Sequence, residues 1–570
     1  MKNPFVFDRP NTIEVEEFIK YYIKDNTYTR FLESTRNIVL IGVRGSGKTS
    51  TLRYYSLPVS FHNPDIKDKF KLVGIHIPCK QPLLGKREYL LYDNENKQNV
   101  VVEHLLCINI LTEVCNTFLE LNGAILIKNN IKDDILSNLS YIFDTEFKNV
   151  SSLFDAIKLF VNKESNSSQR KLNNESFESF IDYAFTFNNT VIPLLEQLKK
   201  IPELSKSHFS LFFDDIQDLG SVHQRILNSW ISFRDNKLFS LKVATAATKP
   251  IYITSSGGVI LEGHDFVRID LTKGLFNKNS EFSKFAKDVI QKRLDIANIN
   301  TTVDDFLPIS QSLKNDLEKG KQKARKLAEI KYPNPTGTQI TDYVSKYARA
   351  ITFRERKAKA NIPNYSGFET LVDISTGVIR NLLNPLYFMY EKELSKNEQN
   401  GEIMFIHPST QKDIIKTKCD ELWEKIRKID SDLDNCSKEL GKHINNFYNQ
   451  LVEYLKKRLK DETISEPRAL NFIVSDIDPS MNERITEIID ASLKSTLLYE
   501  RSIPHKSTGE KLPLYVPNRM ILPSHGLDPH GQYSHFPIKG KDFLEAAINN
   551  KPLPFFAEEK REENQLKMGI

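Results

Sequence analysis

The stretch IGVRGSGKTS at residues 41–50 constrains this 570-residue chain more than any other segment. The pattern G-x-x-x-x-G-K-[ST] is filled by Gly42, Gly47, Lys48 and Thr49. An apolar, β-branched run at 37–41 precedes the pattern, and a segment that can begin a helix follows it. A strand, a glycine loop and a helix in this order direct backbone N–H groups toward an anion at the helix N-terminus. The sequence therefore predicts a phosphate-binding loop on a parallel α/β sheet.

The predicted loop implies ATP and Mg²⁺ as cofactors. Lys48 would reach the β and γ phosphates, and Thr49 would hold the metal. The alternative is a glycine turn with an exposed lysine. The residues expected to surround the nucleotide are Gly42, Arg44, Gly45, Ser46, Gly47, Lys48, Thr49 and Ser50.

Two aspartates end a second apolar run, in HFSLFFDDIQDLG at 208–220. At the end of a buried parallel strand, Asp214 would bind the magnesium through water, and Asp215 would orient the attacking water. An acidic turn after an ordinary strand is the alternative. The side chain of Asp215 is one methylene shorter than the glutamate often found at this position, so the sequence leaves the hydrolysis rate open.

A further strand is expected within 238–250, with polar residues at its end. Thr248 is the first candidate for a polar side chain beside the γ-phosphate, and Thr245 is the alternative. The segment 251–271 ends in another strand-like run.

The segment 368–392 predicts two helical pieces, the second of which opens with Gly377-x-x-Arg380. With these motifs in this order, the chain resembles the AAA+ superfamily, in particular ATPases similar to the origin recognition complex and its archaeal and bacterial initiator relatives. The resemblance implies an α/β fold with a P-loop AAA+ parallel-sheet core, a helical lid and a C-terminal winged-helix-like domain. It also implies that Arg380 of the lid reaches the γ-phosphate.

The same resemblance implies oligomers or complexes in which an arginine enters a neighbouring subunit's site and neutralises charge on the γ-phosphate. The sequence does not choose among the candidates Arg225, Arg234 and Arg268, each of which can instead be a solvated surface residue.

We expect four parts, with boundaries that follow the motifs. Residues 1–300 would form the ATPase core with a helical insertion, and 301–395 a basic insertion and the lid. Residues 396–465 would form a helical connector, and 466–570 the winged-helix-like domain.

Composition narrows the partners and the location. The 79 basic and 74 acidic residues give a formal net charge of +5, so any basic surface that attracts nucleic acid must be local. Five cysteines without zinc-ligand spacing are typical of a reducing compartment. No leader-like or membrane-spanning apolar run occurs, so we expect a cytoplasmic protein without membrane contact.

Two segments are candidates for binding double-stranded DNA. Residues 309–360 carry 13 Lys or Arg against 5 Asp or Glu, although a solvated helix face would have the same composition. Residues 482–522 predict a helix and then a hairpin, the order of a winged helix, with phosphate contacts from Arg501, Lys506, Lys511 and Arg519. Because Glu483, Glu487 and Asp490 lie on that helix, a protein partner is an equal alternative.

The predicted activity is hydrolysis of ATP to ADP and phosphate, with Lys48, Asp215, Thr248 and Arg380 as the catalytic set. The resemblance suggests a switch that senses DNA or a partner and licenses an effector, as in bacterial anti-phage defence. A replication initiator or loader of a plasmid or prophage is one alternative. An ATP-binding scaffold with little hydrolysis is another.

Overall fold

The computed structural model describes residues 3–6, 10–24, 29–81, 84–85, 88–121, 123–147, 152–173, 184–233, 236–246, 251–271, 281–355, 363–396, 403–433, 436–504 and 511–555. The chain folds into two compact units. One comprises residues 8–271, and the other comprises residues 1–7 together with 272–570.

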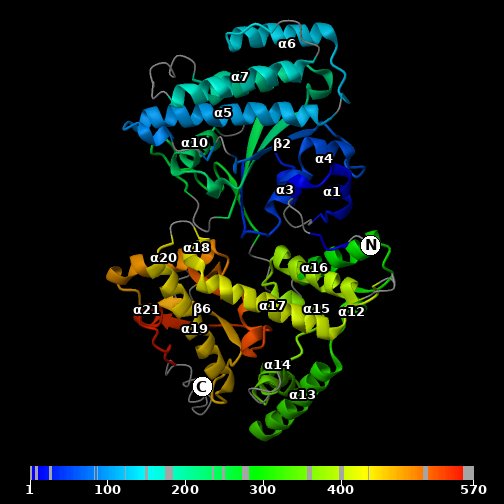
Figure 1. The fold of residues 1–570 in the computed structure, drawn as a ribbon, viewed down its shortest axis with the longest axis vertical. Helices are drawn as coiled ribbons and strands as arrows, with labels where there is room; N and C mark the ends of the chain where they lie inside the picture. The colour runs from blue at the N-terminus through cyan, green and yellow to red at the C-terminus, as the bar shows by residue number, and fades with distance from the viewer. Residues whose placement is uncertain are drawn as a thin grey trace. The chain divides into compact units, whose positions relative to one another are not determined.

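The unit 8–271 is built on a five-stranded, wholly parallel sheet with the order β2-β3-β4-β1-β5 (Figure 1). The strands are β1 (Ile38–Ile41), β2 (Leu72–Pro78), β3 (His208–Asp214), β4 (Phe239–Thr245) and β5 (Val267–Asp270). The α/β class and the parallel sheet expected from the sequence are confirmed. Because β4 lies between β1 and β3, the carboxyl ends of these three strands meet at one edge of the sheet.

Successive residues of β1 pack into different cores, which explains why the whole strand is apolar. Val39 and Ile41 join the core under α5 (Glu95–Leu119) and α10 (Ser221–Ile231). Ile38 and Leu40 join the core under α1 (Val15–Tyr21) and α3 (Lys48–Tyr54). The sheet is therefore covered by helices on both faces.

A long helical insertion separates β2 from β3, as the wide spacing of the motifs indicates. It contains α5, α6 (Asn129–Ile142), α7 (Leu153–Asn173) and α9 (Ile192–Leu198), and its long helices are stacked outward from the sheet in Figure 1. Among the described residues, α5 alone is long and apolar enough to cross a membrane, but 72% of its most apolar window is buried. Since α5 packs on β2, α7 and α10, it is a core helix of this unit.

The second unit begins about 30 residues before the boundary expected at residue 300. Its first helices are α11 (Glu281–Ile296) and α12 (Val303–Phe306), followed later in the chain by α15 (Phe368–Ile374), α16 (Ile379–Lys396) and α17 (Pro408–Arg427). Because α11 packs on α12 and α15, it belongs to this unit and not to the sheet unit. Phe5, near the start of the chain, also packs here, with its ring 5.6 Å from that of Phe306.

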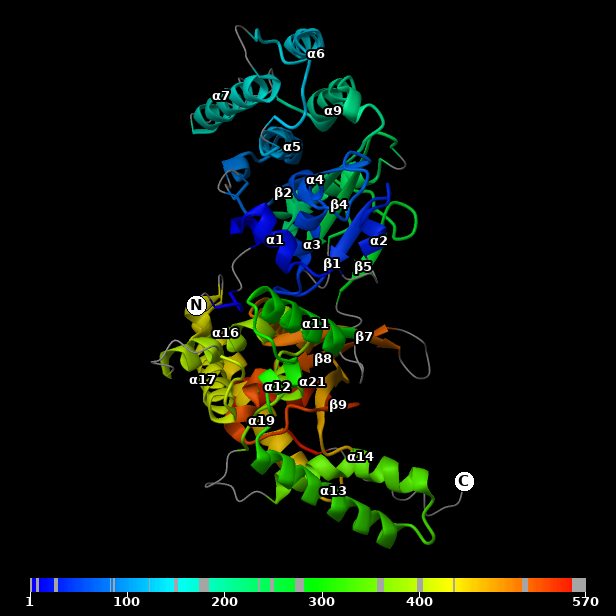
Figure 2. The same cartoon turned by 90° about the vertical axis from the view of Figure 1, so that its right-hand side faces the viewer.

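An antiparallel helix pair, α13 (Gln311–Lys331) and α14 (Gly337–Arg354), extends away from the other helices of this unit (Figure 2). The two helices approach closely at Gly320, where an added Cβ would lie 2.1 Å from Thr352 Oγ1 and 2.6 Å from the carbonyl oxygen of Ala348. A glycine in the middle of α13 therefore serves packing.

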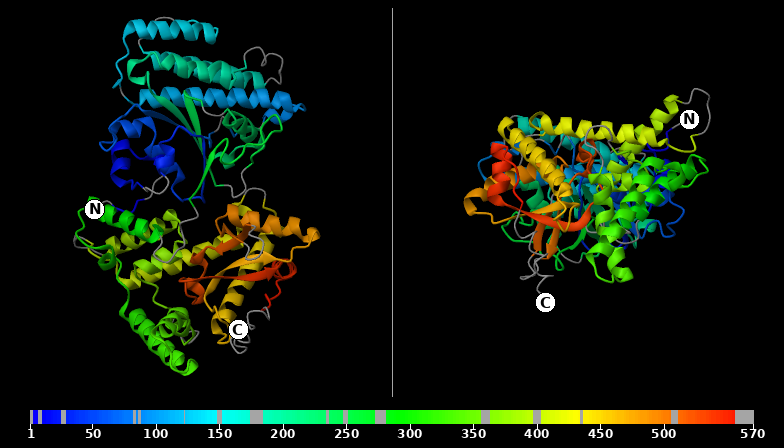
Figure 3. Two further views of the ribbon diagram at one scale, coloured as in Figure 1. Left: turned by 180° about the vertical axis from the view of Figure 1, so that it is seen from behind. Right: turned by 90° about the horizontal axis from the view of Figure 1, so that it is seen from below.

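The last part of the chain forms a mixed four-stranded sheet with the order β7-β8-β6-β9 (Figure 3). Its elements are α19 (Lys438–Lys460), β6 (Ala469–Ser475), α20 (Pro479–Lys494), β7 (Leu498–Pro504), β8 (Lys511–Pro517), β9 (Gln532–Lys539) and α21 (Gly540–Asn549). The helix and hairpin expected at 482–522 are α20 with β7 and β8, and β9 is an additional strand parallel to β6.

Candidate nucleotide site

The predicted phosphate loop begins where β1 ends, between β4 and β5. The Gly42 N–H donates to the Thr245 carbonyl at 3.1 Å, and the Leu271 N–H donates to the Ile41 carbonyl at 2.9 Å. These bonds fix the start of the loop at the edge where the parallel strands end. This is the edge at which open α/β sheets bind ligands.

Two glycines give the loop its path. Gly45 and Gly47 have φ values of 86° and 96°, a region in which residues other than glycine are strained. Gly47 directly precedes α3, whose first turn begins with Lys48 and Thr49. The loop therefore leads directly into a helix N-terminus, as the motif predicts.

The Lys48 side chain folds back on its own loop. Its Nζ donates to the carbonyl oxygens of Gly42 at 2.7 Å and Val43 at 3.1 Å, and the residue is only 4% exposed. The ammonium group is thus held at the loop by two neutral acceptors. A phosphate oxygen is a stronger acceptor for this cation than either carbonyl.

Asp214, the last residue of β3, places a buried carboxylate close to this helix. Its Oδ2 lies 3.4 Å from His76 Nε2 on β2, whereas its Oδ1 is buried without a hydrogen-bond partner among the described residues. Burial alone would raise the pKa of this carboxyl. The hydrogen bond and charge of His76, the Thr49 hydroxyl and the Lys48 ammonium outweigh burial and lower the pKa. Lys48, Thr49 and Asp214 are therefore near neighbours, as the sequence predicts.

These residues fit Mg²⁺ bound with a nucleotide. A hydroxyl and an ionised carboxylate are hard oxygen donors, and Mg²⁺ commonly takes one or two protein oxygens together with phosphate oxygens and waters. The unpartnered Oδ1 of Asp214 is a buried acceptor that a metal-bound water would satisfy. Within the described ranges, no group of three or more His, Cys, Asp or Glu side chains is placed to hold a metal ion.

Asp215 is held by a connection that the motifs do not reveal. It has left-handed backbone angles, φ 58° and ψ 43°, and its Oδ1 accepts a 2.9 Å hydrogen bond from Gln217 Nε2. The Oε1 of Gln217 in turn accepts the backbone N–H of Ala246 at 2.8 Å, one residue after β4. One side chain thus connects the ends of β3 and β4.

Several predicted residues have other surroundings. Arg44 is exposed and pairs with Asp218 at 2.9 Å. The Ser46 hydroxyl is buried without a partner among the residues described, and Ser50 lies in α3. Thr245 is buried at the end of β4, whereas Thr248, the first candidate for the polar side chain, lies outside the described residues.

The candidate arginines lie in both units. Arg225 on α10 pairs with Glu95 at 2.6 Å, and Arg268 on β5 lies 3.8 Å from Asp270. Arg234 lies outside the described residues. Arg380 is in the second unit, exposed at the start of α16, and has no ion pair within the described ranges.

Two of the expected DNA contacts are in the described part of the hairpin strands. Arg501 lies on β7, opposite Leu514, and is partly buried. Lys511 begins β8, and Lys506 lies outside the described residues. Arg519, the fourth candidate, is mostly buried and lies 3.5 Å from Asp373, so the expectation of an open phosphate contact is wrong for this residue.

His76 and Gln217 are the residues that sequence reasoning missed. His76 is the single ionisable residue in the apolar run of β2, and Gln217 is the one uncharged polar residue in the stretch 214–218. Each side chain differs in chemical type from its neighbours in the sequence. That difference alone does not predict which residue the side chain contacts.

Comparison with known proteins gives the family. The sequence model of the family described as ORC-CDC6-like matches residues 3–335 and 303–538. No curated protein matches the chain. Solved structures that match include Cdc6p from Pyrobaculum aerophilum, with 12% identity, 98% of both chains covered and a TM-score of 0.26. They also include the Aeropyrum pernix ORC1 protein in complex with DNA, with 10% identity, 94% of both chains covered and a TM-score of 0.29. These low scores carry no structural argument, and the assignment rests on the family model. Since that model spans most of the sequence, the chain belongs to the ORC-CDC6-like family.

Proposed function

We propose that this chain is a magnesium-dependent AAA+ ATPase that acts as a DNA-associated switch. The observation that carries the proposal is the convergence of Lys48, Thr49 and the buried, ionised Asp214 at the edge where β1, β3 and β4 end. Membership of the ORC-CDC6-like family supports both the nucleotide and the association with DNA.

The chain's own residues account for the steps of binding and hydrolysis. On ATP binding, Lys48 exchanges two loop carbonyls for phosphate oxygens, and the loop N–H groups turn toward the same phosphates. Thr49 and Asp214 would hold Mg²⁺, which neutralises charge on the phosphates. Asp215 orients the attacking water and accepts its proton, provided that Gln217 leaves one carboxylate oxygen available.

The switch would operate through arginines that approach the nucleotide from outside the phosphate loop and its aspartates. An exposed cation is available at Arg380, and Arg225 or Arg268 could enter the site of a second subunit or partner. Such contacts would form only with ATP bound, so assembly would respond to the nucleotide. Licensing of an effector, including in anti-phage defence, and loading of a replication protein are two roles consistent with such a switch.

A scaffold that binds ATP with little hydrolysis is the second candidate, and one observation favours it. Asp215 is shorter than glutamate, and its carboxylate is already bonded to Gln217. A carboxylate in that arrangement can be too constrained to follow the attacking water.

The test is ATP turnover by the full chain, with and without duplex DNA, beside the variants Lys48→Ala and Asp215→Asn. Lys67→Ala, which removes an exposed lysine of the same unit, is the matched control. We expect DNA-responsive turnover in the wild type and in the control, with a loss of at least about 100-fold in both site variants. Negligible turnover in the wild type with ATP still bound would favour the scaffold, and loss of ATP binding would refute both functions.

A further inference from the structure

The helix pair α13–α14 concentrates the positive charge of this chain. Residues 311–355 hold ten Lys or Arg and five Asp or Glu, an excess equal to the net charge of the whole protein. Seven exposed cations lie on α13: Lys314, Lys319, Lys321, Lys323, Arg325, Lys326 and Lys331. Because the net charge of the whole chain is small, a surface that attracts polyanions must be local, and this helix pair is such a surface.

Most of these cations have no carboxylate beside them. Lys321 pairs with Glu318 at 3.5 Å, and Lys323 pairs with Glu355 at 2.6 Å. Within the described ranges no ion pair involves the other five, Lys314, Lys319, Arg325, Lys326 and Lys331. Their charges are therefore available to a ligand in solvent.

The packing of α13 leaves most of these charges off the face that meets α14, although Lys331 Nζ lies 5.9 Å from the centre of the Tyr343 ring on α14. Gly320, Ala324 and Ala328 recur every four residues and form one buried stripe against α14. Helical geometry places Lys319 and Lys326 on one side of that stripe and Arg325 on the other. With a rise of about 1.5 Å per residue, Lys314 and Lys331 are about 25 Å apart, less than the 34 Å of one DNA turn.

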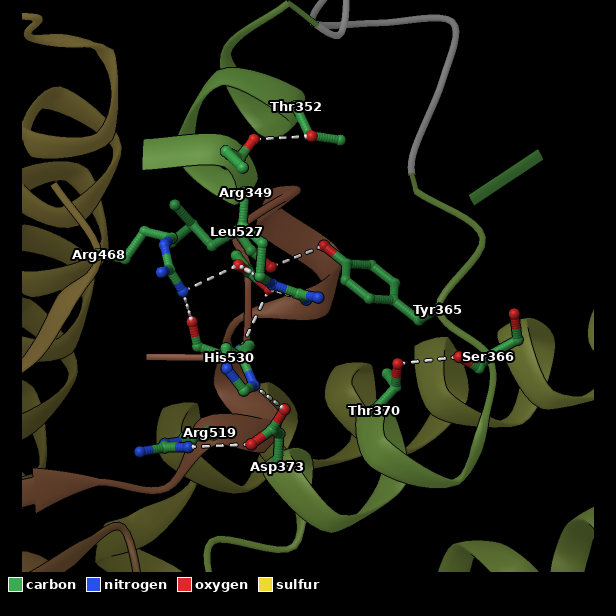
Figure 4. A network of polar contacts seen from close by, with 12 residues as sticks. Arg349, Thr352, Tyr365, Ser366, Thr370, Asp373, Arg468, Arg519, Leu527 and His530 are labelled. Carbon is green, nitrogen blue, oxygen red and sulfur yellow. Dashed lines mark hydrogen bonds and ion pairs between the residues drawn. The ribbon is translucent and has the colours of Figure 1, made fainter. Parts of the chain in front are cut away.

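The base of the pair is fixed to the rest of its unit. Arg349 of α14 makes two hydrogen bonds to the Asp528 carboxylate, at 2.8 and 2.6 Å, and Arg468, the residue before β6, lies 3.7 Å from the same group. In Figure 4 both arginines point toward the segment between Leu527 and His530. This buried, charged contact therefore attaches the base of the helix pair to the C-terminal part of the unit.

The predicted alternative surface, α20, carries no excess of positive charge. Its exposed Glu483 and Glu487 are balanced by the exposed Arg484 and Lys494. Arg519, expected to assist it, pairs with Asp373, which also accepts from His530 at 2.6 Å. A polyanion would therefore be attracted by α13 and not by α20.

We infer that α13 of the α13–α14 pair binds the phosphate backbone of duplex DNA without reading its sequence. The cations of α13 replace counterions condensed on the DNA, and the fixed base of the helix pair keeps α13 attached to its unit. The inference depends on the DNA association proposed above, but not on ATP hydrolysis. Long, flexible lysine side chains on one straight helix suit regularly spaced phosphates better than base edges.

The experiment is a fluorescence-anisotropy titration of the full-length protein with a labelled duplex of arbitrary sequence, over a salt series. The α13 variant carries Lys319→Gln, Arg325→Gln and Lys326→Gln. The control variant carries Lys416→Gln, Lys425→Gln and Lys442→Gln, three exposed lysines on α17 and α19 of the same unit. Both variants lose three charges, and circular dichroism checks that both are folded.

We expect the α13 variant to bind the duplex at least about tenfold more weakly at about 100 mM salt. The slope of log affinity against log salt should fall in magnitude by about two to three. The control should bind like the wild type. Equal binding by the two variants, or no binding of duplex by the wild type, would overturn the inference. ATP turnover of the same preparations without DNA is scored separately, so a failed ATPase proposal is distinguishable from a failed DNA surface.

Discussion

Gln217 is the residue that decides how Asp215 is held. Its amide joins the Asp215 carboxylate to the N–H of Ala246, so truncation frees the carboxylate to adopt other rotamers. If Asp215 orients water, Gln217→Ala should lower kcat by about tenfold and leave ATP affinity within about twofold. Single-turnover hydrolysis and nucleotide titration separate the two quantities.

A matched substitution tests whether the effect is local. Gln224→Ala removes a glutamine of α10 whose amide donates to the Leu219 carbonyl, and turnover should be unchanged. A rise in turnover for Gln217→Ala would contradict the orienting role, because it would show that the glutamine restrains Asp215.

Lys242 gives the sheet unit a pH dependence with a definite sign. It is fully buried in β4, its Nζ donates to the carbonyls of Ser34 and Arg36, and burial lowers its pKa from 10.5 to about 7. Between these values the unfolded chain binds a proton that the folded chain does not. The free energy of unfolding should therefore rise with pH across this window, by up to about 1.4 kcal/mol per unit, and level off below about pH 7.

The variant Lys242→Met should abolish this slope, because its side chain does not titrate. Urea unfolding at a series of pH values between about 7 and 10 measures the slope directly. An exposed control, Lys237→Met, lies two residues before β4 and should keep the wild-type slope. If the slope is the same in all three proteins, another group causes it.

At the scale of elements, the spacing of α13 from α14 depends on Gly320. A Cβ at this position would overlap Thr352 Oγ1 and the Ala348 carbonyl, and backbone atoms do not move as side chains do. We expect Gly320→Val to separate the helices and to cost about 1–3 kcal/mol of the pair's local stability. Hydrogen exchange of α13 and α14 peptides should accelerate accordingly.

The neighbour Gln322 provides the control. It is exposed on the same helix, so Gln322→Val introduces the same β-branched side chain without a clash. Equal exchange rates in the two variants would show that helix propensity, and not the close approach, is the cause.

Elements with strong local patterns were predictable, whereas long-range partners were not. The apolar run of β3 ending in Asp214, the glycine loop and the order of α20 and the β7–β8 hairpin follow from spacing alone. The spacing of Leu422, Ile426 and Leu440 is typical of one helical seam, but α17 ends at Arg427 and α19 begins at Lys438. Ile426 and Leu440 are buried all the same, so both belong to the core.

The polar partners show why the rest could not be predicted. Gln217 meets Ala246 across 29 residues, and Arg349 meets Asp528 across 179. No local signal encodes such pairs, since each depends on which strands are neighbours or on where a helix ends. The loop of Gly42 to Thr49 was predictable because the glycines that set its path lie within one motif, whereas the partners of Gly42 and Arg44 lie outside it.

At the scale of the whole molecule, the division into two compact units makes stability local. Each unit has its own core, and the site residues Lys48, Thr49, Asp214 and Asp215 all lie in the unit 8–271. The charged contact of Asp528 with Arg349 and Arg468 lies wholly in the other unit. A change at Asp528 should therefore be felt in one unit only.

Asp528→Asn tests this locality, because it leaves two arginines beside a buried, neutral amide. Loss of one member of a buried ion pair typically costs about 3–5 kcal/mol, since the remaining charges keep their desolvation penalty. Hydrogen exchange should accelerate in α14, β6 and the segment before β9, while β1, β3 and β4 keep their protection. Asp342→Asn, an exposed change on α14, should alter neither set. Equal acceleration in both units would contradict the division, and would mean that the 570 residues unfold as a single cooperative body.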